Sequence, residues 1–444
     1  MFRSSTHDIN CGFFNQDASR LAVGTMDGYM IMKISPDIKM ITSSHEESTS
    51  LIHLYYNTGL IAHVGGGSEA FSSQRCMKIT NVRTRKEIIR MSYSKKILAV
   101  RINRRFLVLA SDESIRIYDM GTMKLKHTIS SPPANPNGVL ALATCHVLKE
   151  EDKGCRHLLC YPKSNEKGDL FVYDVENQRL LYNLEAHTSP VACVAFNNRG
   201  SLLATASEKG TKFRVFATAT RAKLYELRRG YATRARVLSM NFCPESKYLC
   251  VSSEKATVHV FKTDHHDQEA VAPPEAPEES DSWSSYFTSG LSSAVSYFAP
   301  SLPEMWTEER SFAMATLDEA CENTSALVYE DRRLVLIVFT STGDLYKFWV
   351  HEDGTVTPKQ RVSVLSIERE YAQGVHTAST SQDGEESDDM AHATAGMRQL
   401  LAGEGDEESA PPPQHQQQHQ QQARGDEAQA SARKELASDE QDHQ

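Results

Sequence analysis

Two adjacent arginines followed by a glycine are the residues of this sequence best suited to bind an anion. They form the run Leu227-Arg228-Arg229-Gly230. Each guanidinium presents a planar fork of donors that fits the oxygens of a phosphate. If the run is extended, the two side chains point to opposite sides of the chain, because side chains alternate along a strand. One motif could then serve two separate anion sites, although the pair taken alone is more commonly a solvated turn.

The elements around this motif repeat along the chain. Shifting residues 191–211 by 46 positions places them on residues 237–257 and superposes Phe196 on Phe242 and Ser207 on Ser253. Both copies alternate apolar and polar residues with period two, which is typical of strands separated by polar turns. Weaker copies follow Phe14 and Leu107 and lie near residues 51–82, 139–175 and 311–350, which gives seven units. A spacing of about 45 to 50 residues is that of one propeller blade, so we expect an all-β, seven-bladed, WD-repeat-like β-propeller.

Composition separates a folded part from a tail. From Tyr371 to Gln444 there are fifteen acidic and four basic residues, so the formal charge of −10 belongs to this segment. The tail, 371–444, is also rich in Gln and His, and we expect it to be disordered because it cannot bury enough apolar surface. A second break, 264–309, is read as an insertion between the sixth and seventh units. The first 370 residues are near neutral and carry no basic stripe, which argues against a nucleic-acid-binding protein.

Other function classes find little support. The sequence has no Gly-x-Ser-x-Gly elbow, His-Glu-x-x-His pair or Walker loop, so we expect neither an enzyme nor a bound cofactor. The run Asp264-His265-His266-Asp267 could ligate a metal, but it opens the insertion and is expected to be solvated. No apolar run approaches the roughly 20 residues of a membrane span, and a signal peptide is not evident, so we expect a cytoplasmic protein. The nine scattered cysteines include no Cys-x-x-Cys pair and are expected to be reduced core thiols.

The insertion contains an uncharged aromatic segment. Residues 282–302 include no charged side chain. Drawn as a helix, the segment has an apolar stripe opposed by Ser and Thr, which indicates a helix that lies in a membrane interface. The alternative is that the stripe folds back on the propeller. The predicted membrane-inserting residues are Trp283, Tyr286, Phe287, Leu291, Val295 and Phe298.

Residues 187–261 resemble the PROPPIN family of phosphoinositide-binding propellers. The matching runs are SEKGTKFRVF at 207–216, LRRG at 227–230 and SSEKATVHVF at 252–261, with Leu227 in place of the commoner Phe. The resemblance extends over residues 8–367 and is nearest to the WIPI branch. It implies a seven-bladed propeller with two headgroup sites and a membrane-active loop.

Two sets of residues are implied as phosphoinositide sites by this resemblance. Site 1 comprises His187, Thr205, Ser207, Gly210, Thr211, Arg214 and Arg228. Site 2 comprises Arg229, Gly230, Arg236, Ser253, Lys255, Thr257 and His259. The hydroxyls and guanidiniums are suitable phosphate donors, the glycines let backbone N–H groups approach, and the histidines could add positive charge as the pH falls.

The resemblance further implies a phosphoinositide effector that binds phosphatidylinositol 3-phosphate and phosphatidylinositol 3,5-bisphosphate and scaffolds autophagosome formation. It would be peripheral on phagophore, preautophagosomal and endosomal membranes. Its implied partners are a lipid-transfer protein of autophagy and the conjugation machinery, the latter through Arg104, although neighbouring Arg105 or a plain solvated turn is an alternative reading there. The competing hypothesis is a WD-repeat scaffold that binds proteins only and has no lipid specificity.

Overall fold

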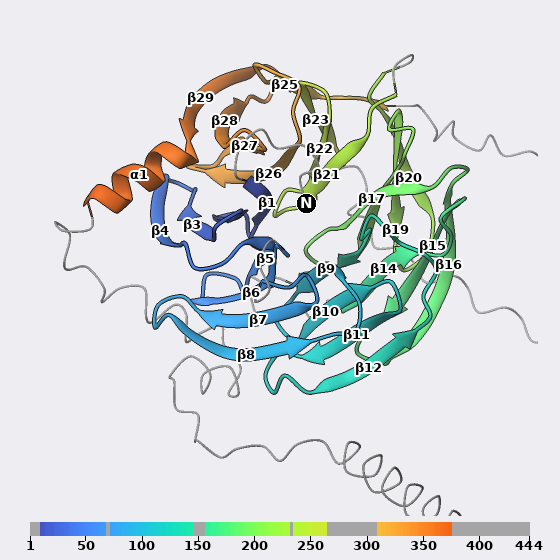
Figure 1. Cartoon of the computed structure of the whole chain (residues 1–444). Coiled ribbons are helices and arrows are strands. Elements are labelled where there is room, and N and C mark those ends of the chain that lie inside the picture. The colour runs from blue at the N-terminus through green and yellow to red at the C-terminus, as the bar shows by residue number, and fades with distance from the viewer. Residues whose placement is uncertain (1–8, 68–71, 146–155, 231–233, 264–308, 375–444) are drawn as a thin grey trace, which may run out of the picture. The chain divides into compact units, whose positions relative to one another are not determined.

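The structure is a computed structural model that describes residues 9–67, 72–145, 156–230, 234–263 and 309–374. Within these ranges seven sheets follow one another around a ring, as Figure 1 shows. Each sheet contains consecutive strands of the chain in antiparallel order, apart from one added two-residue strand. The predicted all-β, seven-bladed propeller is confirmed.

The strands of the first four blades have the following bounds. Blade 1 contains β1 (Ile9–Phe14), β2 (Arg20–Thr25), β3 (Tyr29–Lys33) and β4 (Lys39–Ser44). Blade 2 contains β5 (Thr49–Leu54), β6 (Leu60–Gly65), β7 (Cys76–Asn81) and β8 (Lys86–Ser92). Blade 3 contains β9 (Ile97–Ile102), β10 (Phe106–Ser111), β11 (Ser114–Asp119) and β12 (Leu125–Ser130). Blade 4 contains β13 (Ala141–Leu142), β14 (Leu158–Pro162), β15 (Gly168–Asp174) and β16 (Arg179–His187).

The last three blades carry the candidate site and the closure of the ring. Blade 5 contains β17 (Val191–Phe196), β18 (Leu202–Ser207), β19 (Lys212–Ala217) and β20 (Lys223–Arg228). Blade 6 contains β21 (Val237–Phe242), β22 (Tyr248–Ser253), β23 (Thr257–Lys262) and β25 (Ala313–Thr316). Blade 7 contains β26 (Asn323–Glu330), β27 (Arg333–Thr340), β28 (Asp344–Val350) and β29 (Val356–Ser363). The short strand β24 (Glu309–Arg310) adds in parallel to β20, and the helix α1 (Val364–Gly374) follows blade 7.

The core lies between neighbouring blades. Each sheet packs on both faces, so the middle strands are buried along most of their length, as in β18 and β22. The contact between blades 5 and 6 is typical: Phe213 and Leu227 of blade 5 pack with Phe261 of blade 6, and all three side chains are fully buried. Six of the eight described cysteines are also buried, as the sequence predicted.

Residues of the first strands of all seven blades line a central cavity of about 1030 Å³. In each blade, the turn between the first and second strands lies at one end of this channel, which we call the first-turn end. The turn between the second and third strands lies at the other, the second-turn end, because the second strand spans the distance between them. Chain direction therefore fixes the end at which each turn residue lies.

In the described ranges, the first and last blades of the ring share no strand. Blades 7 and 1 meet through an apolar cluster that includes Leu21, Phe339 and Val364, the first residue of α1. The buried Lys347 ammonium donates to Glu330 in blade 7 and to the Pro36 carbonyl in blade 1, at 2.7 Å in both cases. Side-chain packing and these bonds therefore hold the junction.

Three boundaries differ from the predictions. The insertion interrupts blade 6 and does not separate blade 6 from blade 7, because β25 pairs with β23 across it. Blade 7 begins at Asn323, and residues 313–316 belong to blade 6. The helix α1 continues to Gly374, past the predicted tail boundary, and Tyr371 packs in the junction cluster. Among the described residues, no helix is long and apolar enough to cross a membrane.

Candidate anion-binding site

The arginine motif lies at the end of β20, the last strand of blade 5. Leu227 is fully buried against blade 6. Because side chains alternate along the strand, Arg229 shares the side of Leu227, whereas Arg228 shares the side of Glu226 and faces blade 4. Arg229 is held in place by a bond from its Nε to the Gly210 carbonyl (3.2 Å) and by one from its amide to the Thr211 carbonyl (3.1 Å). The two guanidiniums therefore belong to different crevices between blades.

Site 1 lies in the crevice between blades 4 and 5. The Thr205 hydroxyl donates to the Arg214 carbonyl at 3.3 Å, so it accepts from His187 Nε2 at 2.9 Å. Arg214 is the neighbour of Thr205 in the β18–β19 ladder, and its Nη1 donates to the Ala186 carbonyl of blade 4 at 2.5 Å. Three residues predicted for site 1 thus join the two blades.

Glu226 is a member of this crevice that the sequence reading missed. Its carboxylate accepts from Lys212 (2.5 Å), Arg214 (3.0 Å) and Lys223 (3.1 Å). Burial alone would raise the pKa of Glu226, but the three charged donors lower it to about 2. The crevice thus contains one carboxylate, three cations bonded to it and Arg228, so positive charge is in excess there. A signal was present in the sequence, since a residue two positions before Arg228 on a strand lies on the same side.

Site 2 lies in the crevice between blades 5 and 6. Ser253 ends β22, and Thr257 and His259 lie on β23. The ring nitrogen Nδ1 of His259 lies 3.2 Å from the Ser311 hydroxyl, in the segment between β24 and β25. Ser311 was not among the predicted site residues. No local signal identifies it, because the contact spans the whole insertion.

The strand pairing in blades 5 and 6 differs by one residue from the sequence repeat. The repeat, a shift of 46 positions, superposed Thr211 on Thr257 and makes Val251 the equivalent of Thr205. Thr205 lies opposite Arg214 in blade 5, whereas Val251 lies opposite His259 in blade 6. His259 therefore takes the structural place of Arg214. Blade 5 has one more residue than blade 6 in this turn, which contains Gly210.

Both site histidines are neutral at physiological pH. Burial, and then the nearby Arg214, lowers the pKa of His187 to about 4. Burial, and then Arg229, lowers the pKa of His259 to about 4. The expectation that these histidines add charge as the pH falls is therefore wrong over the physiological range. The positive charge of the sites comes from the arginines and lysines.

The remaining predicted site residues lie at the second-turn end. Gly210 has φ of +60°, and a Cβ there would lie 1.7 Å from the Ala235 carbonyl oxygen, so only glycine fits. Ser207 is buried, Thr211 is half-buried and Lys255 is exposed in its turn. Arg236 pairs with Glu322 and, at 3.7 Å, with Glu254, so its charge is already compensated. No atom lies within 4 Å of a Cβ built on Gly230, so no close contact in the described residues requires glycine there.

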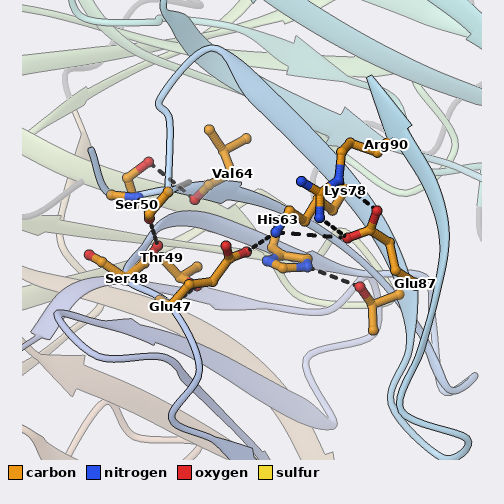
Figure 2. Close-up of polar contacts among 12 residues, drawn as sticks. Glu47, Ser48, Thr49, Ser50, His63, Val64, Lys78, Glu87 and Arg90 are labelled. Carbon is orange, nitrogen blue, oxygen red and sulfur yellow. Dashed lines mark hydrogen bonds and ion pairs between the residues drawn. The ribbon is translucent and has the colours of Figure 1, made fainter. Parts of the chain in front are cut away.

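The equivalent positions of blade 2 have balanced charges. His63, Lys78 and Arg90 lie side by side across the second, third and fourth strands of blade 2. Thr205, Arg214 and Glu226 form the corresponding row in blade 5. Figure 2 shows Glu47 and Glu87 turned toward these cations, with Glu47 2.5 Å from Lys78 and Glu87 2.7 Å from Arg90. Two carboxylates thus balance two cations, in contrast to the excess of cations at site 1.

Arg104 lies in the β9–β10 turn, at the first-turn end. Its guanidinium carbon is 5.5 Å from the centre of the Tyr56 ring, and its carbonyl accepts from the Tyr55 hydroxyl at 3.2 Å. Arg105 instead pairs with Glu176 at 2.7 Å. Arg104 therefore lies in the crevice between blades 2 and 3, and Arg105 faces blade 4. The predicted membrane-inserting residues, from Trp283 to Phe298, lie outside the described residues.

A family model described as PROPPIN matches residues 8–358. Among curated proteins, WD repeat domain phosphoinositide-interacting protein 1 of Xenopus laevis is 32% identical over 348 residues, covering 77% of this chain and 76% of that protein. Autophagy-related protein 18 of Yarrowia lipolytica is 34% identical over 340 residues, covering 69% of this chain and 83% of that protein.

Solved structures share the fold. Kluyveromyces lactis Hsv2 aligns with a TM-score of 0.59 at 20% identity, covering 81% of this chain and all of that chain. A structure titled as a complex of KlAtg21 with the coiled coil of AgAtg16 aligns with a TM-score of 0.59 at 23% identity, covering 80% of this chain and 99% of that chain.

Proposed function

The chain belongs to the PROPPIN family, and from that premise we propose that it binds phosphoinositides on membranes through site 1 and site 2. Its relatives are named phosphoinositide-interacting and autophagy-related proteins. The protein is a binding scaffold of autophagy and not an enzyme. The lipids proposed for it are phosphatidylinositol 3-phosphate and phosphatidylinositol 3,5-bisphosphate, on phagophore, preautophagosomal and endosomal membranes.

The observation that carries this proposal is the opposite orientation of Arg228 and Arg229. Each arginine faces a different crevice, and each crevice has its own neutral histidine and buried hydroxyl residue, His187 with Thr205 and His259 with Ser253. Charge-assisted bonds from a guanidinium to a phosphate are roughly twice as strong as neutral ones. The excess cations around Glu226 favour the phosphate further.

The insertion supports membrane contact by its point of attachment. It leaves blade 6 after β23, where Thr263 bonds to Ser246 and Lys247 of the first turn. It returns through β24, where Arg310 lies beside Arg228 in the strand ladder. The returning end of the insertion therefore adjoins the arginine motif. We propose that its aromatic residues enter the membrane beside the headgroups, because tethered weak contacts gain strength through effective concentration.

Partner recruitment is proposed for the crevice of Arg104. This residue lies at the first-turn end, whereas the motif, at the end of a fourth strand, lies at the second-turn end. A partner could therefore bind while both lipid sites are occupied. The proposed partners are a lipid-transfer protein and the conjugation machinery of autophagy. The structure titled as a complex with the AgAtg16 coiled coil supports the second of these.

Liposome flotation tests the lipid sites. The vesicles contain phosphatidylinositol 3-phosphate or unphosphorylated phosphatidylinositol, and the variants are Arg228→Ala, Arg229→Ala and both together. We expect lipid-selective flotation that weakens with each single change and is lost in the double variant. Arg199→Ala is the charge-matched control, because Arg199 is exposed at the other end of blade 5. Equal flotation of wild type and double variant would favour a protein-only scaffold.

A further inference from the structure

The central channel contains a half-buried arginine, Arg101, which forms no ion pair with a carboxylate of the described residues. Arg101 lies on β9 and lines the cavity. Within the part of the chain that the structure describes, it makes one hydrogen bond, from Nη1 to the neighbouring Val100 carbonyl at 2.8 Å. Burial lowers the pKa of Arg101, opposed only by the thiol of Cys193 across the channel. A guanidinium has five N–H donors and stays charged, so most of its capacity to bind an anion is unused.

A second underused group lies beside it. His53 lines the same cavity from β5, and its Nε2 is buried without a hydrogen-bond partner. Its ring packs on Phe13, with ring centres 4.3 Å apart. Burial, and then the charge of Arg101, lowers the pKa of His53. Both side chains line the cavity from first strands that contact each other, β5 and β9. Buried polar groups are normally satisfied, so a neutral imidazole left with a spare N–H points to a ligand.

The acidic residues of the channel wall do not neutralise this pair. Arg101 and His53 each stand one residue before the end of a first strand, which places them at the first-turn end. Glu208 and Glu322 lie at the second-turn end, and Glu322 is engaged by Arg236. The acidic wall residue at the first-turn end is Asp17, whose carboxylate already accepts from Ser19 and Asn57.

We propose that the central channel binds a small soluble oxyanion of the inorganic phosphate class between Arg101 and His53. The guanidinium fork donates two parallel bonds to the oxyanion, and His53 Nε2–H donates a third. This binding site is separate from site 1 and site 2, which lie in crevices between blades. The cavity is larger than a phosphate, so water fills the remaining space.

The test removes the proposed headgroup sites first. Full-length protein carrying Arg228→Ala and Arg229→Ala is titrated with inorganic phosphate by calorimetry. We expect binding that weakens by roughly 10- to 100-fold when Arg101→Met is added, the usual effect of losing hydrogen bonds to a charged group. Arg105→Met is the matched control, since Arg105 is exposed and pairs with Glu176. No phosphate binding by the parent, or equal binding after Arg101→Met, would overturn the proposal.

Two further variants keep the test decisive. His53→Phe retains the aromatic packing on Phe13, removes the donor and is expected to weaken phosphate binding several-fold; unchanged binding would contradict the role of His53. If Arg101→Met fails to fold, Arg101→Lys replaces it and is expected to bind phosphate more weakly than the parent, because it loses the fork. In the wild-type background, Arg101→Met should float with phosphatidylinositol 3-phosphate vesicles as wild type does. Loss of flotation would identify the ligand as a lipid headgroup and refute a separate soluble-anion site.

Discussion

Replacing Gly210 by alanine should damage site 2 through the backbone. The residue has φ of +60°, a conformation that costs a non-glycine residue about 1–2 kcal/mol. The new Cβ would also lie 1.7 Å from the Ala235 carbonyl, so the turn and this connection must separate by more than about 1 Å. Overpacking of this kind costs about 1–3 kcal/mol, which gives a total loss of about 2–5 kcal/mol in the free energy of unfolding.

The displacement also acts on function, because Arg229 Nε donates to the Gly210 carbonyl at 3.2 Å. Moving that carbonyl displaces the guanidinium, and losing one charge-assisted bond to the lipid weakens binding by roughly tenfold or more. Phosphoinositide binding is measured by flotation in the Arg228→Ala background, which isolates site 2, and stability is measured by urea unfolding.

Gly200→Ala is the matched control for both measurements. Gly200 has φ of +72° in the turn at the other end of blade 5, where the nearest atom to a Cβ is 2.9 Å away. We expect it to cost the conformational term of about 1–2 kcal/mol and a smaller steric term than Gly210→Ala, because the contact is 2.9 Å and not 1.7 Å, and to leave lipid binding unchanged. If Gly210→Ala is no less stable than Gly200→Ala and binds lipid as its parent does, the link between this turn and Arg229 is wrong.

Three further results are expected. Ser311→Ala removes the hydroxyl beside the site 2 histidine and should weaken lipid binding several-fold in the Arg228→Ala background; unchanged flotation would contradict this role. Lys347→Met leaves Glu330 buried without the partner that is itself fully buried and should lower the unfolding free energy by about 3 kcal/mol in urea, whereas Lys359→Met, at a more exposed residue, should cost less. The pKa of His45 is raised chiefly by its bond to a neighbouring carboxylate, so its stabilising effect is present below its unfolded pKa and is lost as the pH rises through the folded value. His45→Gln should therefore destabilise the protein more at pH 6 than at pH 8.5, and an equal loss at both values would count against it.

The fold was predictable because most blades are contiguous stretches of chain with their own alternation of apolar and polar residues. The errors arose where strands that pair in the structure are far apart in the sequence. The strand Ala313–Thr316 belongs with β23, but more than forty residues intervene, and alternation does not reveal which sheet a short strand joins. The helix α1 did have a signal, because Val364, Ile367 and Tyr371 recur at three- and four-residue spacing.

The candidate site was predictable in its residue types and less so in its electrostatics. The alternation of Arg228 and Arg229 follows from strand geometry alone. The neutral state of His187 and His259 does not, because burial between blades determines the pKa and burial depends on packing from distant segments. The one-residue shift that puts His259 in the place of Arg214 is likewise visible only in the strand ladders.

Because the ring closes through side-chain contacts and not through a shared strand, the order of the blades depends only on how the chain connects them. No sheet in the described residues borrows a strand from the other end of the chain, so a circular permutant that joins the ends of the propeller near Ile9 and Ser363 and opens between Ser44 and Thr49 keeps every ladder intact. Duplicating or deleting the segment of any blade from 1 to 4 likewise adds or removes a whole sheet and leaves the strand pairing of its neighbours unchanged. The junction between blades 7 and 1 is then one of seven comparable interfaces and is distinguished mainly by the helix packed over it.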